Sequence, residues 1–447
     1  DYMFEMTYDE GQGWHDAQIV PYEEIKVSPA NATLHYGQAI FEGMKAFRQG
    51  KDVVIFRTKD HLNRLNNSAR ILDIPPIDVD LVYDALHQLI TIEKDWVPNK
   101  KGQSLYIRPF IFADDPFLGV SVSKRYKFYI ILSPVAAYYA HGFAPVKIMV
   151  EDTYVRATKG GLGEAKTPAN YAASLHAGLE AHKNGYDQVL WLDGVHRKYI
   201  GEVGSMNILF KIDGKIVTPA LDGTILNGIT RRTVLAVAKE WGMEVEERPI
   251  TIDELVEDYE NGKLEEVFGS GTAAVISPVG VLGYKDKVMT INDGKIGPFA
   301  QKMFNYITGL QSGEEKDIPN DKFFYQRAMQ LMFEDKVDKA TESILDNSII
   351  KNKFTEYREQ VANIIGGETY FAKPRHRIRP ENGTGSELKF LLTGIAPDEL
   401  FFKAGQQAFN TKKWFKIFGT FGAGLLGVTV LAQFFFGKMP NKKVNKK

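Results

Sequence analysis

A lysine with a nearby phenol and a downstream carboxylate forms the most informative group of residues in this chain. Lys166 lies among small residues in segment 164–171, Tyr171 follows five positions later, and Glu202 lies in the strand-like segment 199–204. A carbonyl cofactor needs an amine that forms a Schiff base, a phenol that hydrogen-bonds its ring oxygen, and a carboxylate that keeps its ring nitrogen protonated. These residue types therefore indicate a Schiff-base enzyme with Lys166 as the amine.

Composition limits the classes of protein and of site that this chain can represent. The chain has 447 residues, enough for two or three domains, and its 44% hydrophobic and 25% charged content is typical of a globular protein. The net charge of −1 gives no electrostatic reason to expect nucleic-acid binding. The sequence contains no cysteine, which excludes disulfides, thiolate metal sites and a cysteine nucleophile. Nine histidines are scattered without metal-ligand spacing, so we expect no metal site.

The elements that must position these residues follow an α/β pattern. Apolar runs and helical spacing predict strands at 53–56, 104–112, 126–132, 145–151, 187–192, 206–212 and 266–269, and helices at 61–72, 169–183 and 230–241. We predict a small α/β domain over residues 1–135, a linker over 136–144 and a large domain over 145–316. Lys166 and Glu202 both belong to the large domain.

The character of the chain changes after residue 316. Residues 1–316 carry a net charge of −8, and residues 317–447 carry +7. We predict a helical and loop extension over 317–411, followed by an uncharged run of 21 residues, 417–437, between lysine clusters in segment 412–447. This run is long enough for a single transmembrane helix, and the alternative is a buried core helix. The lysines that follow it favour a cytoplasmic or matrix-side C-terminus.

Seven short segments give residues 1–316 a family resemblance. They are HYGQAIFEG (35–43), HLNRL (61–65), YIRP (106–109), EAKTPANY (164–171), EVGSMN (202–207), LNGITR (226–231) and GSGTAA (269–274). In order and separation this set resembles the branched-chain-amino-acid aminotransferases, which are fold-type IV enzymes dependent on pyridoxal 5′-phosphate. The resemblance implies a two-domain α/β (α+β) fold like that of D-amino acid aminotransferase, followed here by the C-terminal segment.

The resemblance implies a role for each residue that would meet the cofactor. Lys166 corresponds to the catalytic lysine, which holds the cofactor as an internal aldimine and then moves the α-proton of the substrate. Glu202 corresponds to the carboxylate that faces the pyridine nitrogen, and Tyr171 to the phenol on the ring oxygen. The remaining cofactor contacts, to the phosphate or the ring face, correspond to Arg64, Leu226, Ile229, Thr230 and Thr272.

The resemblance also implies a substrate pocket and a partner subunit. Phe41 and Tyr106 would wall an apolar pocket with Tyr171, and Arg108 would serve the second carboxylate of glutamate. Thr272 and Ala273 would meet the substrate carboxylate through their backbone. The partner subunit of a homodimer would contribute Tyr36, Leu118 and Val120. The implied activity is ping-pong transamination of leucine, isoleucine and valine with 2-oxoglutarate, in a cytoplasmic enzyme.

Three departures from the family pattern leave alternatives open. Thr167-Pro168-Ala169 replaces the usual Thr-Gly-Gly, which predicts a stiffer loop after the lysine. Ala274 and Ser277 stand where some relatives carry a Cys-x-x-Cys redox switch. Residues 317–447 resemble nothing in the family, so they are either a membrane tether or an unrelated tail. The alternative functions are a D-amino acid transaminase, an aminodeoxychorismate lyase, or a membrane-anchored interaction subunit that carries the aminotransferase part as a passenger.

Overall fold

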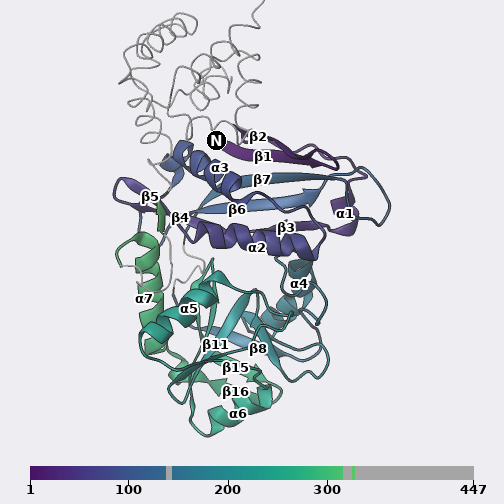
Figure 1. Ribbon diagram of the computed structural model, residues 1–447. Coiled ribbons are helices and arrows are strands. Elements are labelled where there is room, and N and C mark those ends of the chain that lie inside the picture. The colour runs from purple at the N-terminus through teal and green to yellow at the C-terminus, as the bar shows by residue number, and fades with distance from the viewer. Residues whose placement is uncertain (137–142, 316–324, 328–447) are drawn as a thin grey trace, which may run out of the picture.

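Two β-sheets, one above the other, form the body of the molecule in the computed structural model (Figure 1). The structure describes residues 1–136, 143–315 and 325–327. The first sheet belongs to the N-terminal part of the chain and the second to the part from residue 146 onward. The two sheets fall on either side of the predicted linker, and the boundaries of the domains stay a prediction.

The first sheet has the strand order β17-β5-β4-β6-β7-β1-β2, with β3 paired to β6. Its strands are β1 (Tyr2–Asp9), β2 (Gly13–Pro21), β3 (Ala39–Phe41), β4 (Met44–Gln49), β5 (Asp52–Phe56), β6 (Ser104–Ala113), β7 (Arg125–Val135) and β17 (Tyr325–Arg327). All neighbours are antiparallel, and β6 pairs with β7 along its whole length. Two residues separate β3 from β4, and both strands pair with β6.

The second sheet closes on itself. Its order is β10-β9-β8-β15-β14-β11-β12-β13, and β10 also pairs with β11, so six strands complete a ring. Its strands are β8 (Val146–Glu151), β9 (Gln188–Leu192), β10 (Ile200–Val203), β11 (Met206–Ile212), β12 (Lys215–Thr218), β13 (Val245–Glu247), β14 (Leu264–Gly271), β15 (Val275–Tyr284) and β16 (Lys287–Thr290). Closure leaves fewer free strand edges and fixes the position of β10.

Helices cover the sheets and fill the space between them. They are α1 (Ala32–Tyr36), α2 (Thr58–Ile71), α3 (Val79–Ile92), α4 (Pro168–Lys183), α5 (Ile229–Glu240), α6 (Ile252–Glu260) and α7 (Pro298–Ser312), with 3-10 turns η1 (Lys94–Trp96) and η2 (Ile291–Gly294). Leu62 and Leu65 of α2 pack with α3 into the core of the first sheet. The opposite side of α2 faces the second sheet (Figure 1).

A third core joins the two halves. Phe56 at the end of β5 packs with buried residues of α5, α7 and the second sheet, among them Phe268. Burying one such side chain contributes about 1.5–3 kcal/mol. The halves are therefore held together beside α2, where the segments that carry the predicted site residues meet.

The structure confirms the predicted elements up to residue 269, with shifts of a few residues at their ends. The helix predicted at 61–72 is α2, those at 169–183 and 230–241 are α4 and α5, and the seven predicted strands are β5, β6, β7, β8, β9, β11 and β14. The N-terminal hairpin, α3, α6, β15 and α7 were not predicted. In α3 the buried Val82, Leu86 and Leu89 follow helical spacing, so this helix had a local signal that the prediction overlooked.

The C-terminal predictions lie outside the described residues, apart from the short strand β17. This applies to the extension over 317–411 and to the predicted transmembrane run at 417–437. Among the helices that the structure describes, none is both long and apolar enough to cross a lipid bilayer.

Candidate active site

Lys166 is held at the junction between the two halves of the molecule. Its backbone N–H donates to the Ser68 hydroxyl of α2 at 2.9 Å, and its carbonyl accepts from the Phe41 N–H at 3.0 Å. The buried Thr167 hydroxyl donates to the Ala39 carbonyl at 2.8 Å. Pro168 then begins α4, a position that suits its fixed φ and its missing N–H. Contacts with α2 and β3 of the N-terminal half therefore fix the backbone of this lysine.

The Lys166 amine lies among aromatic rings. Its Nζ donates to the Tyr171 hydroxyl at 2.5 Å and lies 4.7 Å from the centre of the Phe41 ring. Burial, assisted by the nearby Arg64 guanidinium, lowers the pKa of Lys166 to about 8. Burial also raises the pKa of Tyr171 to about 12. A neutral amine is the form that attacks a carbonyl, so this environment suits a Schiff-base lysine.

Glu202 lies in a hairpin that closes the second sheet. Gly204 adopts a positive φ of 54° at the turn, and Glu202 pairs directly with Asn207 on the next strand. Cross-strand partners share a face, and the Asn207 amide donates to Glu202 Oε1 at 3.0 Å. The Leu226 N–H donates to the same oxygen at 3.1 Å. The predicted ring-nitrogen carboxylate is thus buried and oriented by neighbouring donors.

Arg156 is the cation that pairs with Glu202, at 2.7 Å from its Nε to Oε2. Its Nη2 also donates to the carbonyls of Gly163 and Thr224, each at 2.8 Å. Gly163 lies three residues before Lys166, and Thr224 lies in the loop that leads to α5. Burial raises the pKa of Glu202, and Arg156 opposes that shift. One guanidinium therefore supports the carboxylate and both loops that flank it.

The N-terminus of α5 offers an anion site. Its N-cap is Gly228, and in the part of the chain that the structure describes no side chain caps the first N–H groups of the helix. A Cβ at Gly228 would lie 1.9 Å from Asn207 Oδ1, which explains the glycine. Arg64 approaches the same loop from α2, and its Nη1 donates to the Asn227 carbonyl at 3.3 Å. Free N–H groups beside a guanidinium are suited to a phosphate.

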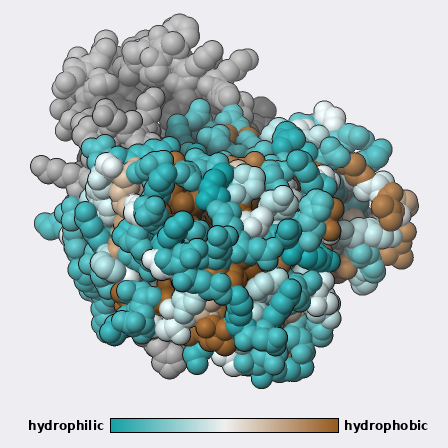
Figure 2. All heavy atoms as spheres, turned by 90° about the horizontal axis from the view of Figure 1, so that it is seen from below, coloured by the Kyte–Doolittle hydropathy of each residue, from teal (hydrophilic) through white to brown (hydrophobic). Residues whose placement is uncertain are grey.

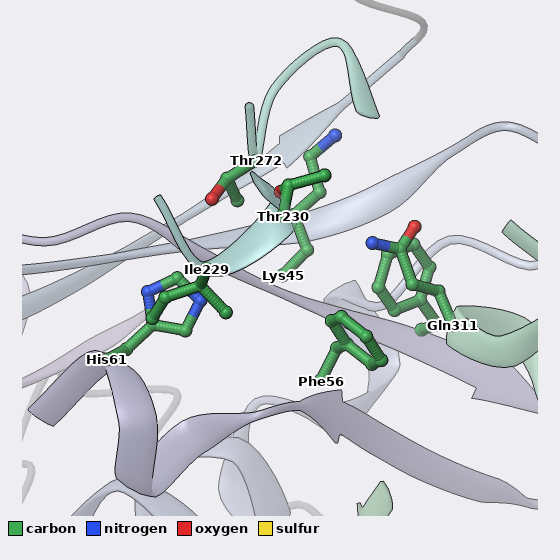
Figure 3. Close-up of a pocket in the computed structure, with 8 residues that line it drawn as sticks. Lys45, Phe56, His61, Ile229, Thr230, Thr272 and Gln311 are labelled. Atoms are coloured by element: carbon green, nitrogen blue, oxygen red, sulfur yellow. The ribbon is translucent and has the colours of Figure 1, made fainter. Parts of the chain in front are cut away.

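A small cavity opens beside this helix start (Figure 3). Its lining includes Ile229, Thr230 and Thr272, three of the predicted phosphate contacts, together with His61 of α2 and Lys45 of β4. Lys45 Nζ donates to the Ala273 carbonyl at 2.7 Å and holds the turn between β14 and β15.

A buried hydroxyl lies on the same side of the second sheet. Among the described residues Ser270 Oγ has no hydrogen-bond partner, and Ser270 pairs across the sheet with Asn207, so both side chains share one face. A buried polar atom without a partner is expected to meet a ligand or an ordered water. This hydroxyl, the uncapped helix and the buried carboxylate together fit the phosphate and ring of pyridoxal phosphate.

Four of the predicted substrate residues, Phe41, Tyr106, Arg108 and Tyr171, lie near Lys166. The rings of Phe41 and Tyr171 lie 5.0 Å apart, and the Arg108 guanidinium lies 4.6 Å above the Phe41 ring. Arg108 Nη2 donates to the Tyr106 hydroxyl at 2.8 Å, while its buried Nε has no hydrogen-bond partner among the described residues. Aromatic walls with one cation beside them can accept an apolar side chain and a carboxylate.

Three predicted site residues lie on the surface of this chain. Tyr36, Leu118 and Val120 are 42%, 63% and 87% exposed. They share an apolar surface patch with Leu34, Phe117 and Val122, which we call the α1 patch. Figure 2 shows apolar atoms gathered at the end of the molecule where Figure 1 places α1. The contribution of these three residues to a partner subunit stays a prediction.

Sequence reasoning missed several residues that support the site. Glu42, His61 and Asn207 lie within the seven segments that carry the family resemblance. Their polar side chains in the same segments as site residues were a signal that they support the site. Lys45 follows one of these segments closely. Arg156 lies outside all of them, and only the folded chain brings it to Glu202.

Comparisons with known proteins agree with this fold. Residues 39–281 match the family model described as amino-transferase class IV. The chain therefore belongs to the class IV aminotransferases. It is also 54% identical over 318 residues to branched-chain-amino-acid aminotransferase 2 of Bacillus subtilis (strain 168), a match that covers 71% of this chain and 88% of that protein. Within its class, the chain belongs to the branched-chain-amino-acid aminotransferases.

Solved structures give the same result. The branched-chain aminotransferase of Escherichia coli matches with a TM-score of 0.60 and 31% identity, over 72% of this chain and 97% of that chain. The enzyme of the archaeon Thermoproteus uzoniensis, solved with norvaline, matches with a TM-score of 0.57 and 28% identity, over 71% of this chain and 97% of that one. The resemblance read from the seven segments is confirmed, and the matches leave the C-terminal segment unrecognised.

Proposed function

We propose that this chain is a pyridoxal-phosphate-dependent aminotransferase that exchanges the amino group between branched-chain L-amino acids and 2-oxoglutarate. The observation that carries the proposal is the Lys166 amine, 2.5 Å from the Tyr171 hydroxyl and with its pKa lowered to about 8, in the half of the chain that also holds the buried Glu202 carboxylate. The products are branched-chain 2-oxo acids and L-glutamate.

The cofactor, when bound, supplies an electron-withdrawing ring that stabilises negative charge at the substrate Cα. Lys166 Nζ would remove the Cα proton of the amino-acid substrate and pass it to the C4′ carbon of the cofactor, and it would transfer a proton in the opposite direction when 2-oxoglutarate is aminated. Its lowered pKa leaves much of the amine neutral near pH 8, as a base must be. The Glu202 carboxylate holds a proton on the ring nitrogen, and Tyr171 hydrogen-bonds the ring oxygen. Leu226 packs on the ring face, while Arg64, Ile229, Thr230 and Thr272 hold the phosphate.

Substrate selection combines an apolar pocket with one cation. Phe41, Tyr106 and Tyr171 accept the branched side chain, and Arg108 takes the second carboxylate of glutamate in the other half-reaction. The backbone of Thr272 and Ala273 meets the α-carboxylate, and Lys45 holds that turn through the Ala273 carbonyl. One pocket can therefore serve both substrates of a ping-pong cycle.

The Arg108→Gln substitution tests this division of roles. We expect kcat/KM for 2-oxoglutarate to fall at least about tenfold more than kcat/KM for leucine, because only glutamate and its oxo acid present a second carboxylate. Equal losses for both substrates would show that Arg108 does not select between them.

The alternative functions predict other activities of the wild-type protein. Turnover of D-leucine but not L-leucine would favour a D-amino acid transaminase, and release of pyruvate would favour a lyase.

We propose that a second copy of this chain binds the α1 patch and forms a homodimer. The patch is apolar and exposed, and a partner's Tyr36, Leu118 and Val120 would complete each pocket. Light scattering should give twice the chain mass, and Leu118→Asp with Val120→Asp should give monomers with impaired leucine binding. A monomeric wild-type protein would contradict this proposal.

The structure and the role of the C-terminal segment are proposed from its sequence alone. We infer a helical and loop extension over 317–411, apart from the short strand β17, and a membrane anchor over 417–437 between lysine clusters, attached to an enzyme part that acts in the cytoplasm. Liposome flotation of the full chain and of a chain with five of its apolar residues in 417–437 changed to serine would test the anchor. Equal flotation of the two would exclude it.

A further inference from the structure

Glu42 is a buried carboxylate that the proposed mechanism does not use. It lies between β3 and β4 and is fully buried. Its Oε1 accepts from Arg64 Nε at 2.7 Å, and its Oε2 accepts from Arg64 Nη2 at 2.9 Å, from His61 Nδ1 at 2.8 Å and from the Gly43 N–H at 3.1 Å. A buried carboxylate is tolerated only when its oxygens are paired in this way.

The paired geometry determines how Arg64 is presented. Glu42 occupies Nε and Nη2 on one edge of the guanidinium. The remaining nitrogen, Nη1, faces the Asn227 carbonyl at 3.3 Å, two residues before α5 begins. A planar guanidinium held along one edge cannot rotate freely, so Glu42 directs its other edge toward the uncapped start of α5.

His61 connects the same carboxylate to the cavity. It lies one turn before Arg64 on α2, contacts Glu42 and lines the cavity with Ile229, Thr230 and Thr272 (Figure 3). Burial lowers the pKa of His61, so the neutral ring donates from Nδ1 to Glu42. His61 and Arg64, the two side chains of α2 that reach toward the predicted phosphate site, therefore both hydrogen-bond to Glu42.

We propose that Glu42 is a positioning residue for the cofactor phosphate and acts by holding Arg64 in its binding orientation. This inference rests on the proposed function. The negative charge of Glu42 weakens the attraction of Arg64 for a phosphate, so any benefit must come from the geometry. Preorganising a binding side chain through its neighbours is the general way to obtain such a benefit.

The test compares two ligands that differ only in the phosphate. Dissociation constants for pyridoxal phosphate and for pyridoxal would be measured from the visible absorbance change on binding to the apo full-length protein. For Glu42→Gln, which keeps the shape but replaces an acceptor with a donor, we expect about tenfold weaker binding of pyridoxal phosphate. Pyridoxal binding should stay as in the wild type, because it does not use Arg64.

Asp60→Asn is the matched control. Asp60 lies on α2, the helix that carries Arg64, and like Glu42 it pairs with arginine, with Arg57 at 2.6 Å and Arg232 at 3.1 Å, but it does not contact Arg64. Its loss should leave both dissociation constants unchanged. Thermal unfolding of each apo variant reports structural damage separately from ligand preference.

A double-mutant cycle keeps the proposal falsifiable if Glu42→Gln alone folds poorly. Glu42→Gln combined with Arg64→Gln should bind pyridoxal phosphate as Arg64→Gln alone does, because Glu42 acts through Arg64. Additive losses, equal losses for both ligands, or no loss in Glu42→Gln would each overturn the inference. A wild-type protein without preference for pyridoxal phosphate over pyridoxal would instead refute the proposed function.

Discussion

Replacing Arg156 with glutamine should destabilise the protein and give its stability a new pH dependence. The guanidinium lies 2.7 Å from Glu202 Oε2, and the two side chains are 11% and 4% exposed. Removing one partner of a buried ion pair costs about 3–5 kcal/mol because the other charge is left unpaired. For a cooperative unit of about 300 residues this corresponds to a fall in Tm of about 5–8 °C.

The sign of the pH dependence follows from Glu202. Burial raises its pKa in the folded state, and Arg156 opposes that shift. Without Arg156 the folded-state pKa rises further above the unfolded value. A carboxyl with a raised folded pKa contributes stability below its unfolded pKa and loses it as pH rises through the folded pKa. The deficit of Arg156→Gln should therefore be large at pH 7.5 and smaller at pH 5.5.

The assay is thermal unfolding of the apo protein at both pH values. Arg48→Gln is the matched control, because Arg48 also donates to backbone carbonyls, Val97 at 3.2 Å among them, and has no carboxylate partner among the described residues. Its deficit should not depend on pH. If the deficit of Arg156→Gln is the same at pH 7.5 and 5.5, the reasoning about the buried pair is wrong.

Three further predictions concern the amine, the phosphate loop and a helix cap. The rate at which the apo protein takes up pyridoxal phosphate should rise with pH around a midpoint near 8, the pKa of Lys166, and a midpoint above 10 would contradict the buried-amine account. Gly228→Ala should weaken cofactor binding and cost about 1–3 kcal/mol, because its Cβ would lie 1.9 Å from Asn207 Oδ1. An unchanged dissociation constant and an unchanged Tm would argue against this close approach. Glu266 accepts from the first N–H groups of α7 at 2.9 Å, so Glu266→Ala should lower stability by about 1–2 kcal/mol without changing kcat, as thermal unfolding and steady-state assays would show. A large loss of kcat at unchanged Tm would contradict a purely structural role.

Much of the fold could be predicted because its signals are local. The apolar run of β5 and the helical spacing of α2 lie within single segments, and both elements form where they were predicted. The N-terminal hairpin and α7 were missed because their burial depends on partners far away in the chain. Glu266 of β14, for example, caps α7 from more than thirty residues away.

In the site, too, residues with local signals could be predicted and residues that meet only through the fold could not. Lys166 and Tyr171 are five residues apart, so their 2.5 Å contact has a local signal. Glu42 and Arg64 are brought together by the strand pairing of β3 and the position of α2, and Arg156, 46 residues before Glu202, meets it only in the folded chain. Spacing along the chain identifies residues that do chemistry, whereas the charges that orient them become visible only in the folded structure.

The most direct test of the account is the absorbance spectrum of the purified full-length protein with pyridoxal phosphate, recorded before and after adding L-leucine, beside Lys166→Ala. We predict a visible band that requires Lys166, that leucine converts to the pyridoxamine form, and that 2-oxoglutarate restores. A wild-type spectrum identical to that of Lys166→Ala, or one that leucine leaves unchanged, would contradict the proposed aminotransferase.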